Sequence, residues 1–240
     1  VSLTLHVGSA QAITGRTGFV HLFEHLLFLG SEKLGRGGLD RLSSRVGGSV
    51  ANGSTSRDRT NYFQTVPNDS LERMLWAEAE KLGYFINTVT ESVLQKEKQV
   101  VKNEKRQGVD NRPYGHNQYV IDSNLYPSDH PYSWQVIGSL EDLQNASLDD
   151  VKTFYNKWYV PNNATLVVAV DFDVQQARGW VEKYFGEIPA GSEIEPLASR
   201  PATLNETALL SWEDSFAQLP QLTMVWPGAE LYHPDIYPLE

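Results

Sequence analysis

The first part of the chain changes from a two-residue hydrophobic period to a helical one. Residues 1–7 (VSLTLHV) alternate and are rich in β-branched side chains, so they predict a strand. Residues 18–29 have an apolar body at helical spacing, and residues 39–46 predict a short helix that ends at a Gly-Gly pair. Residues 49–66 are rich in Thr, Tyr, Phe and Val and predict two strands or one bent strand.

Two longer amphipathic helices are predicted next. Leucine and methionine recur on one side of residues 71–84, and Asp69 or Ser70 is placed to cap this helix. Thr90 is placed to cap a second helix over residues 91–107.

Loops dominate the middle of the chain. Residues 109–146 are punctuated by prolines and predict a loop-rich segment. Ser147 and Asp150 have the spacing of a capping box for a helix that runs to about Tyr159. The run ATLVVAV at residues 164–170 predicts a buried strand.

The last part of the chain adds one helix and two strands. Asp173 is placed to cap a helix that ends at Phe185, before a glycine. A Pro- and Gly-rich stretch at residues 189–204 follows, and two further strands are predicted near 206–212 and 221–226. Strands occur in adjacent pairs without strict alternation with helices. The pattern therefore predicts an α+β fold with a largely antiparallel sheet and helices packed on one face.

Composition narrows the function classes. The chain has 240 residues, 40% of them hydrophobic and 21% charged, which suffices for a packed core. Its net charge of −10 argues against nucleic acid as a partner, because nucleic-acid binders present basic surfaces. No segment has the apolar length that a membrane span needs. The absence of cysteine leaves His, Asp and Glu as the only side chains for a zinc site.

The strongest chemical signal is HLFEH at residues 21–25. On a helix, His21 and His25 lie one turn apart on one face, which suits two nitrogen ligands of one zinc ion. Glu24 lies on the flank of that face and can act on a water molecule without binding the metal. This is the inverted form of the H-E-x-x-H zinc peptidase motif. The alternative is that both histidines lie on the surface without a function. It requires two histidines and one glutamate to fall on this spacing by chance.

A catalytic zinc site needs a third protein ligand. The helix predicted over residues 91–107 carries Glu97 and Glu104, which two helical turns bring to nearly the same face beside apolar residues. A carboxylate on an apolar face is costly unless it is paired or binds a metal. Spacing alone leaves open whether this helix supplies the ligand and which glutamate does so.

Three separated motifs in the right order carry a family resemblance. GFVHLFEHLLFLGS, NGSTSRDRTNY and KEKQVVKNEKRQGVDNRPYG resemble the pitrilysin family of zinc peptidases, which includes insulysin and the mitochondrial processing peptidase. The resemblance extends to about residue 190 and includes FYNKWYVPNNATLVVAVDFD. It implies a zinc endopeptidase that acts on oligopeptides or unfolded segments, with one Zn²⁺ per chain.

The resemblance also assigns roles to individual residues. It implies that Glu104, 79 residues after His25, is the third zinc ligand and that Glu97 is its companion behind the ligands. It implies that Glu24 is the general base. It further implies that residues 52–55 form an edge strand to which the substrate peptide adds as a further strand; these residues are Asn52, Gly53, Ser54 and Thr55. The family usually has alanine in place of Gly53.

Members of the family are built from two homologous halves that close like a clam shell. The resemblance predicts a zinc-binding domain over residues 1–190, a linker over 191–205 and the truncated start of a second homologous domain over 206–240. The expected partners are therefore a peptide and a second half or partner subunit, and the chain alone is expected to be weakly active or inactive. A bacterial periplasmic location is favoured. The alternative functions are a non-catalytic scaffold of the same fold and a zinc-storage module, for which no fourth ligand is visible.

Overall fold

The computed structural model describes residues 1–169 and 171–236 as four short strands and eight α-helices. The strands are β1 (Ser2–Leu5), β2 (Asn52–Thr55), β3 (Thr60–Phe63) and β4 (Ala164–Val167). The helices are α1 (Phe19–Phe28), α2 (Gly38–Arg45), α3 (Leu71–Tyr84), α4 (Glu91–Lys105), α5 (Asn117–Leu125), α6 (Leu140–Asn145), α7 (Leu148–Trp158) and α8 (Val174–Phe185).

The strands form one antiparallel sheet in the order β2-β3-β1-β4. Leu3 lies opposite Tyr62 on one side and Leu166 on the other, and Leu3 and Tyr62 are buried. The opposite face is mostly polar, and Thr4 and Ser2 both donate to the Asn61 side chain there. This alternation confirms the predicted antiparallel α+β fold.

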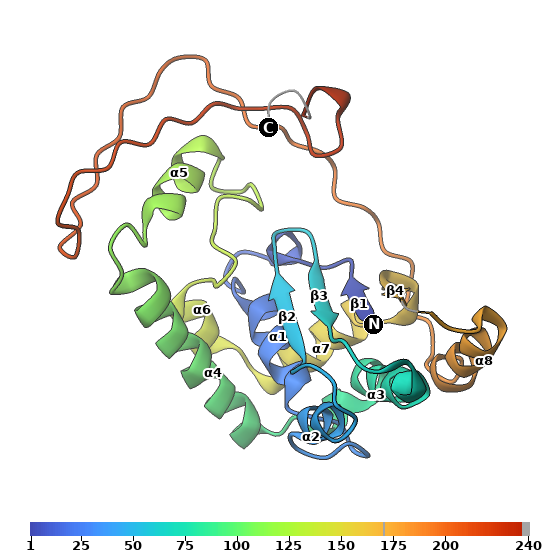
Figure 1. The fold of residues 1–240 in the computed structure, drawn as a ribbon. Coiled ribbons are helices and arrows are strands. Elements are labelled where there is room, and N and C mark those ends of the chain that lie inside the picture. Colours follow the sequence, from blue (N-terminus) through green and yellow to red (C-terminus); the bar gives the residue numbers. More distant parts are fainter. Residues whose placement is uncertain (170, 237–240) are drawn as a thin grey trace.

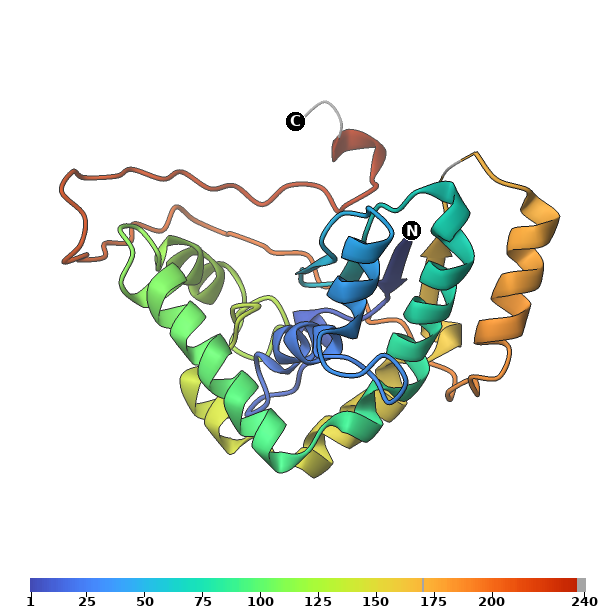
Figure 2. The same cartoon turned by 60° about the horizontal axis from the view of Figure 1, so that its bottom comes forward.

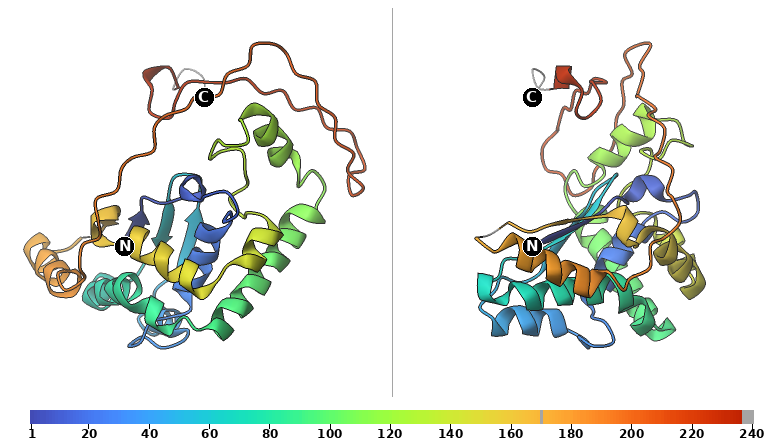
Figure 3. Two further views of the ribbon diagram at one scale, coloured as in Figure 1. Left: turned by 180° about the vertical axis from the view of Figure 1, so that it is seen from behind. Right: turned by 90° about the vertical axis from the view of Figure 1, so that its right-hand side faces the viewer.

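Helices α1 and α7 lie behind the sheet in Figure 1 and in front of it when the molecule is turned around in Figure 3. Helix α4 lies beyond the β2 edge, on the far side of α1. Helices α3 and α8 pack side by side near the opposite edge, as Figure 2 shows. After α8 the chain runs as a long extended arc past α5 and back.

Helix α1 is the centre of the hydrophobic core. Leu22, Phe23, Leu26 and Leu27 are all 0% exposed. The Phe23 ring lies 5.0 Å from the ring of Tyr159, and further aromatic rings of α7 and the α3–α4 connection surround it. With its apolar stripe buried, the helix turns the other face, which carries both histidines, toward α4.

Most of the predicted helices and their starts are confirmed. The Thr90, Ser147 and Asp173 side chains each accept a hydrogen bond from a first-turn backbone N–H, and Ser147 forms the predicted capping box with Asp150. The prediction for α3 is wrong in one respect. Ser70 occupies the cap position, but its hydroxyl donates to Asp69, and a short 3₁₀ turn leads into the helix instead.

Three predictions are corrected. The segment 109–146 contains α5 and α6, which its prolines obscure because they lie before α5 and between the two helices. The strand at 164–170 is not buried: β4 is an edge strand with alternately half-buried and exposed residues, and Val170 lies outside the described residues. No strand forms near 206–212 or 221–226 within the described part of the chain. Leu209 is 94% exposed, so these apolar residues lack the partner strand that a sheet requires.

Candidate active site

The start of α1 is fixed by backbone geometry and by one carboxylate. Gly18 precedes the helix with a φ of 83°, and a Cβ there would lie 2.6 Å from the carbonyl oxygen of Ile137. Asp142 of α6 accepts hydrogen bonds from the backbone N–H and the hydroxyl of Thr17, at 2.9 and 2.5 Å. Glycine is therefore required at this turn, and α6 holds the entry to the helix that carries the histidines.

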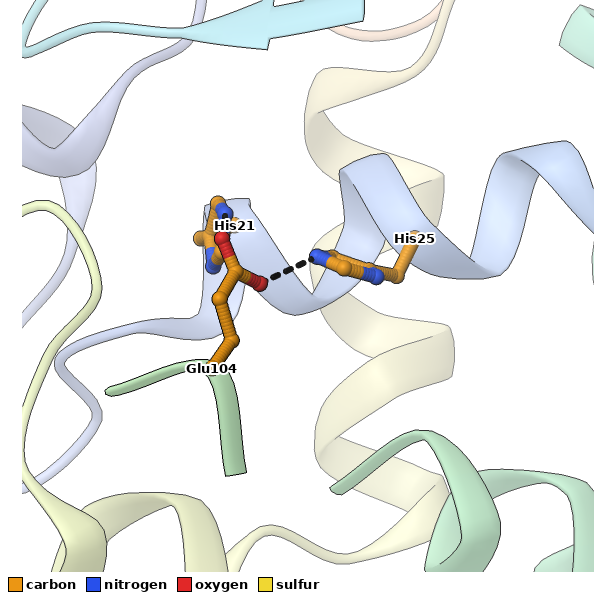
Figure 4. Close-up of side chains that lie close together, drawn as sticks. All are labelled: His21, His25 and Glu104. Atoms are coloured by element: carbon orange, nitrogen blue, oxygen red, sulfur yellow. Dashed lines mark ion pairs between the residues drawn. The ribbon is translucent and has the colours of Figure 1, made fainter. Parts of the chain in front are cut away.

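His21 and His25 project from the same face of α1 toward Glu104 of α4 (Figure 4). The Nε2 atoms of His21 and His25 lie 3.7 and 3.1 Å from the two carboxylate oxygens of Glu104. One ligand atom from each residue can be chosen so that all three lie within 4.8 Å of one another. The structure thus brings two residues from one helix and one from another to a single point.

Polar ties hold α4 in position. Lys98 is buried, and its ammonium group donates to the backbone carbonyls of Gln144, at 3.1 Å, and of Ala146. Lys102, which lies one turn further along α4, donates to the side chain of Gln144. These contacts tie α4 to the end of α6 and determine where Glu104 lies.

The donor set fits a divalent zinc ion. Two imidazoles and one carboxylate are a known ligand combination for catalytic zinc, with one position left open. Burial lowers the pKa of His21 below its ordinary value and the charge of His25 lowers it further, while the carboxylates of Glu104 and Glu24 oppose both effects. A lowered pKa favours the neutral imidazole, which is the form that binds metal.

Glu24 points toward the edge strand of the sheet. One oxygen of its carboxylate accepts a 2.5 Å hydrogen bond from the hydroxyl of Thr55 on β2. The phenols of Tyr62 and Tyr159 lie buried nearby, 3.4 Å apart, and the charge of Glu24 contributes to the rise in the pKa of both, after burial as the main cause. Glu24 is therefore held beside the histidines without belonging to the group of three.

Glu97 lies two turns before Glu104 but outside the group of three. It is only 8% exposed, and burial raises its pKa, while the charges of His25 and Arg36 act in the opposite direction. It lines a pocket of about 230 Å³ at the end of α1, together with Leu26 and Leu29. This position suits a companion behind the histidines better than a ligand.

Residues 52–55 form the β2 edge strand, with α1 packed beside it. The Ser56 N–H donates to the carbonyl of Arg59, so these two residues form a hydrogen-bonded pair of the antiparallel ladder. Hydrogen-bonded and non-hydrogen-bonded pairs alternate along such a ladder. The backbone N–H and C=O groups of Thr55 and Gly53 therefore point away from β3, toward the free edge of the sheet. The N–H of Gly53 already donates to the side chain of Asn52, at 2.8 Å. The Arg59 guanidinium donates to the hydroxyl of Ser54, at 2.8 Å.

Gly53 also fits its place closely. A Cβ at this position would lie 3.0 Å from the Phe28 ring, so alanine would require that ring to shift. The glycine lets the end of α1 approach the edge strand.

Comparison with known proteins decides the family. The model of the insulinase family (peptidase family M16) matches residues 1–127, just over half of the chain, and the model of the peptidase M16 inactive domain matches residues 145–240. The chain belongs to peptidase family M16. The resemblance inferred from the three motifs is thereby confirmed, and family membership supports a peptidase function.

Relatives and solved structures of the M16 family agree. The zinc protease PqqE of Helicobacter pylori is 35% identical over 185 residues, which cover 77% of this chain and 41% of that protein. The β subunit of the mitochondrial-processing peptidase of Saccharomyces cerevisiae is 23% identical over 201 residues, which cover 83% of this chain and 42% of that protein. A crystal structure of a protease from Helicobacter pylori aligns with a TM-score of 0.77 at 32% identity, covering 84% of this chain and 48% of that one. The structure of pitrilysin aligns with a TM-score of 0.72 at 23% identity, and the alignment covers 84% of this chain and 22% of pitrilysin.

The chain thus spans about two fifths of the length of these first two M16 relatives. Among residues 1–169 and 171–236, no helix has the length and apolarity to cross a membrane.

Several residues that shape this M16 site escaped the sequence argument. The tip of the β2–β3 hairpin is held by an ion pair between Arg57 and Asp122 of α5 and by a 2.6 Å hydrogen bond from Tyr132 to Asp58. The partners lie 65 and 74 residues apart in sequence, so no local pattern links them. The contact of Thr55 with Glu24 is of the same kind, because the partners are 31 positions apart in sequence.

Proposed function

We propose that this chain is the metal-binding part of a zinc endopeptidase, in which His21, His25 and Glu104 hold one zinc ion. The observation that carries the proposal is the convergence of these three side chains on one point, with ligand atoms within 4.8 Å of one another and Glu24 beside them. The zinc protease PqqE is a relative at 35% identity, which supports the same metal.

Glu24 is proposed as the general base. Zinc, when bound, polarises the scissile carbonyl and makes a water molecule more acidic. Glu24 takes the proton of the attacking water and later delivers it to the leaving nitrogen. Thr55 holds one carboxylate oxygen of Glu24, so the other oxygen is available to receive the proton.

We further propose that the substrate is a peptide that adds to β2 as a further strand. The outward backbone groups of Gly53 and Thr55 offer hydrogen bonds to any sequence, because strand addition recognises the main chain. The Asn52 side chain occupies the N–H of Gly53, so a docking peptide displaces it. Unfolded segments and oligopeptides fit this mode, because their backbone N–H and C=O groups are free to pair with the strand.

A second homologous half or partner subunit is proposed to close the site. The chain covers only 41% of PqqE, and a solved structure of the first half of the periplasmic protease PqqL from Escherichia coli aligns with a TM-score of 0.70. The similarity of this chain to the periplasmic protease PqqL also supports a periplasmic location. The 240 residues alone are proposed to have little activity.

The non-catalytic alternative is not favoured by any residue of the site. The inactive-domain model matches residues 145–240, and His21, Glu24, His25 and Glu104 all lie before that range, in the region of the insulinase model. A scaffold has no need of a carboxylate held beside two histidines.

The substitution Glu24→Gln tests the proposal. It keeps the shape and the Thr55 contact but removes the group that accepts the proton. We expect the variant to bind zinc at one equivalent like the wild type and to lose about 10²–10⁴-fold in turnover. Zinc content by mass spectrometry and cleavage of a fluorogenic unstructured peptide, with the second half present, measure the two effects. Near-normal turnover in the variant would contradict the role of Glu24, and a wild type without zinc would contradict the metal site.

A further inference from the structure

The edge strand β2 contacts the proposed general base directly through Thr55. The two sides of this residue face different groups. Its backbone N–H and C=O point to the free edge of the sheet, where the peptide is proposed to dock. Its hydroxyl points toward α1 and donates to Glu24 at 2.5 Å.

Thr55 is also the sole hydrogen-bond partner of the Glu24 carboxylate within residues 1–169 and 171–236. The neighbouring phenols of Tyr62 and Tyr159 are within 3.4 Å of each other, and neither donates to Glu24. A glutamate has three rotatable side-chain bonds, so a carboxylate without this contact samples several orientations. The orientation of the proposed base is therefore set by one hydroxyl on the strand that is proposed to receive the substrate.

The position of that hydroxyl is itself well fixed. The strand ends in a tight hairpin whose tip is held by the ion pair of Arg57 with Asp122. Thr55 pairs with Thr60, whose hydroxyl donates to the carbonyl of Val7 at 2.8 Å. Contacts at the hairpin tip and on the paired strand thus help to fix the position of Thr55.

We propose that Thr55 is a positioning residue that holds Glu24, the proposed base, in the orientation that faces the attacking water. The inference rests on the proposed peptidase function. The hydroxyl of Thr55 holds one oxygen of the carboxylate, so the other oxygen can face the attacking water. This orientation matters for catalysis, because a general base must lie within hydrogen-bond reach of the proton that it accepts.

The test compares Thr55→Val with Thr55→Ser in the protein with both halves present. Valine keeps the shape and the β-branched backbone preference but removes the hydroxyl, whereas serine keeps the hydroxyl. We expect Thr55→Val to lower kcat about tenfold with KM unchanged, a part of the full contribution of a general base. We expect Thr55→Ser to restore most of kcat. Thr165→Val, the same change on the opposite edge strand, is the matched control and should leave both constants unchanged.

Two measurements that do not depend on turnover separate positioning from binding. Zinc content should be equal in all variants, because Thr55 is not a proposed ligand. In a Glu24→Gln background, the dissociation constant of a fluorescein-labelled unstructured peptide, measured by anisotropy, should be the same with and without the Thr55→Val substitution.

Three results would overturn the inference: an unchanged kcat in Thr55→Val, a loss that appears in KM or in peptide affinity, or a Thr55→Ser variant as slow as Thr55→Val. The proposed function fails separately. A wild type that does not cleave the peptide overturns the peptidase proposal together with this inference, whereas an active wild type with a fully active Thr55→Val overturns this inference alone.

Discussion

The two helices that meet at the candidate metal site are held in place by different forces. Helix α1 carries both histidines and is fixed by apolar burial, with Leu22, Phe23, Leu26 and Leu27 at the centre of the core. Helix α4 carries Glu104, which is 47% exposed, and is tied to α6 by the ammonium groups of buried lysines. The relative positions of the two histidines are therefore fixed by α1 alone. The position of Glu104, the third proposed ligand, depends on how α4 packs against α6 and α1.

This difference predicts that damage to α1 destabilises the fold, whereas damage to α4 lowers metal affinity. Substitutions on the two helices separate these effects.

Phe23→Ala should have the largest effect. The Phe23 ring is fully buried against Phe85, Phe154 and Tyr159, and removal of such a ring costs about 3–5 kcal/mol of unfolding free energy. Urea denaturation followed by circular dichroism measures it. Val100→Ala on the exposed side of α4 is the control and should change the unfolding free energy by less than about 0.5 kcal/mol. Equal effects of the two substitutions would contradict the assignment of α1 as the centre of the core.

Glu104→Ala should weaken zinc binding strongly while the metal-free fold keeps its stability. Loss of a ligand is expected to exceed the roughly 10–100-fold effect of changing a group behind the ligands. Competition titration with a chromophoric chelator measures the affinity. Glu97→Ala, on the same helix, should lower zinc affinity by about tenfold or less, because Glu97 lies outside the group of three. The reverse order of the two effects would show that Glu97, and not Glu104, is the ligand.

Lys98→Met should weaken zinc binding less than Glu104→Ala does. It keeps the aliphatic stem but removes the donor to the carbonyls of Gln144 and Ala146, so α4 loses one tie to α6. We expect zinc affinity to fall about tenfold, as for groups that orient a ligand. The exposed Lys96→Met is the matched control and should bind zinc like the wild type. A Lys98→Met variant with unchanged zinc affinity would show that Glu104 is placed without this tie.

The same contrast explains how much could be predicted from the sequence. His21, Glu24 and His25 lie on one helical turn, so their spacing alone placed them on one face. Glu104 is 79 residues from His25, and its role came from the family resemblance, because the lysine contacts that place α4 involve residues over 40 positions apart. The hydroxyl of Thr55 could not be linked to Glu24 from sequence, since a strand pattern does not say which helix packs beside it.

The errors have physical causes too. The residues near 206–212 and 221–226 have strand composition, but strands form only where a neighbouring strand accepts their backbone groups, and none does so in the described part of the chain. The apolar run of β4 predicted burial, yet the strand lies at the edge of the sheet. The composition of a segment shows how favourable its burial would be. Whether it is buried depends on which other elements pack against it, and composition does not give that.

The central claim is that one zinc ion binds between α1 and α4 through His21, His25 and Glu104. The most direct test is a crystal structure of the zinc-loaded protein with anomalous diffraction collected at the zinc edge. The account predicts one anomalous peak per chain, at about 2.0–2.2 Å from one nitrogen of each histidine and from a carboxylate oxygen of Glu104. A peak bound by Glu97 in place of Glu104, or a zinc-saturated protein with no peak between the two helices, would contradict it.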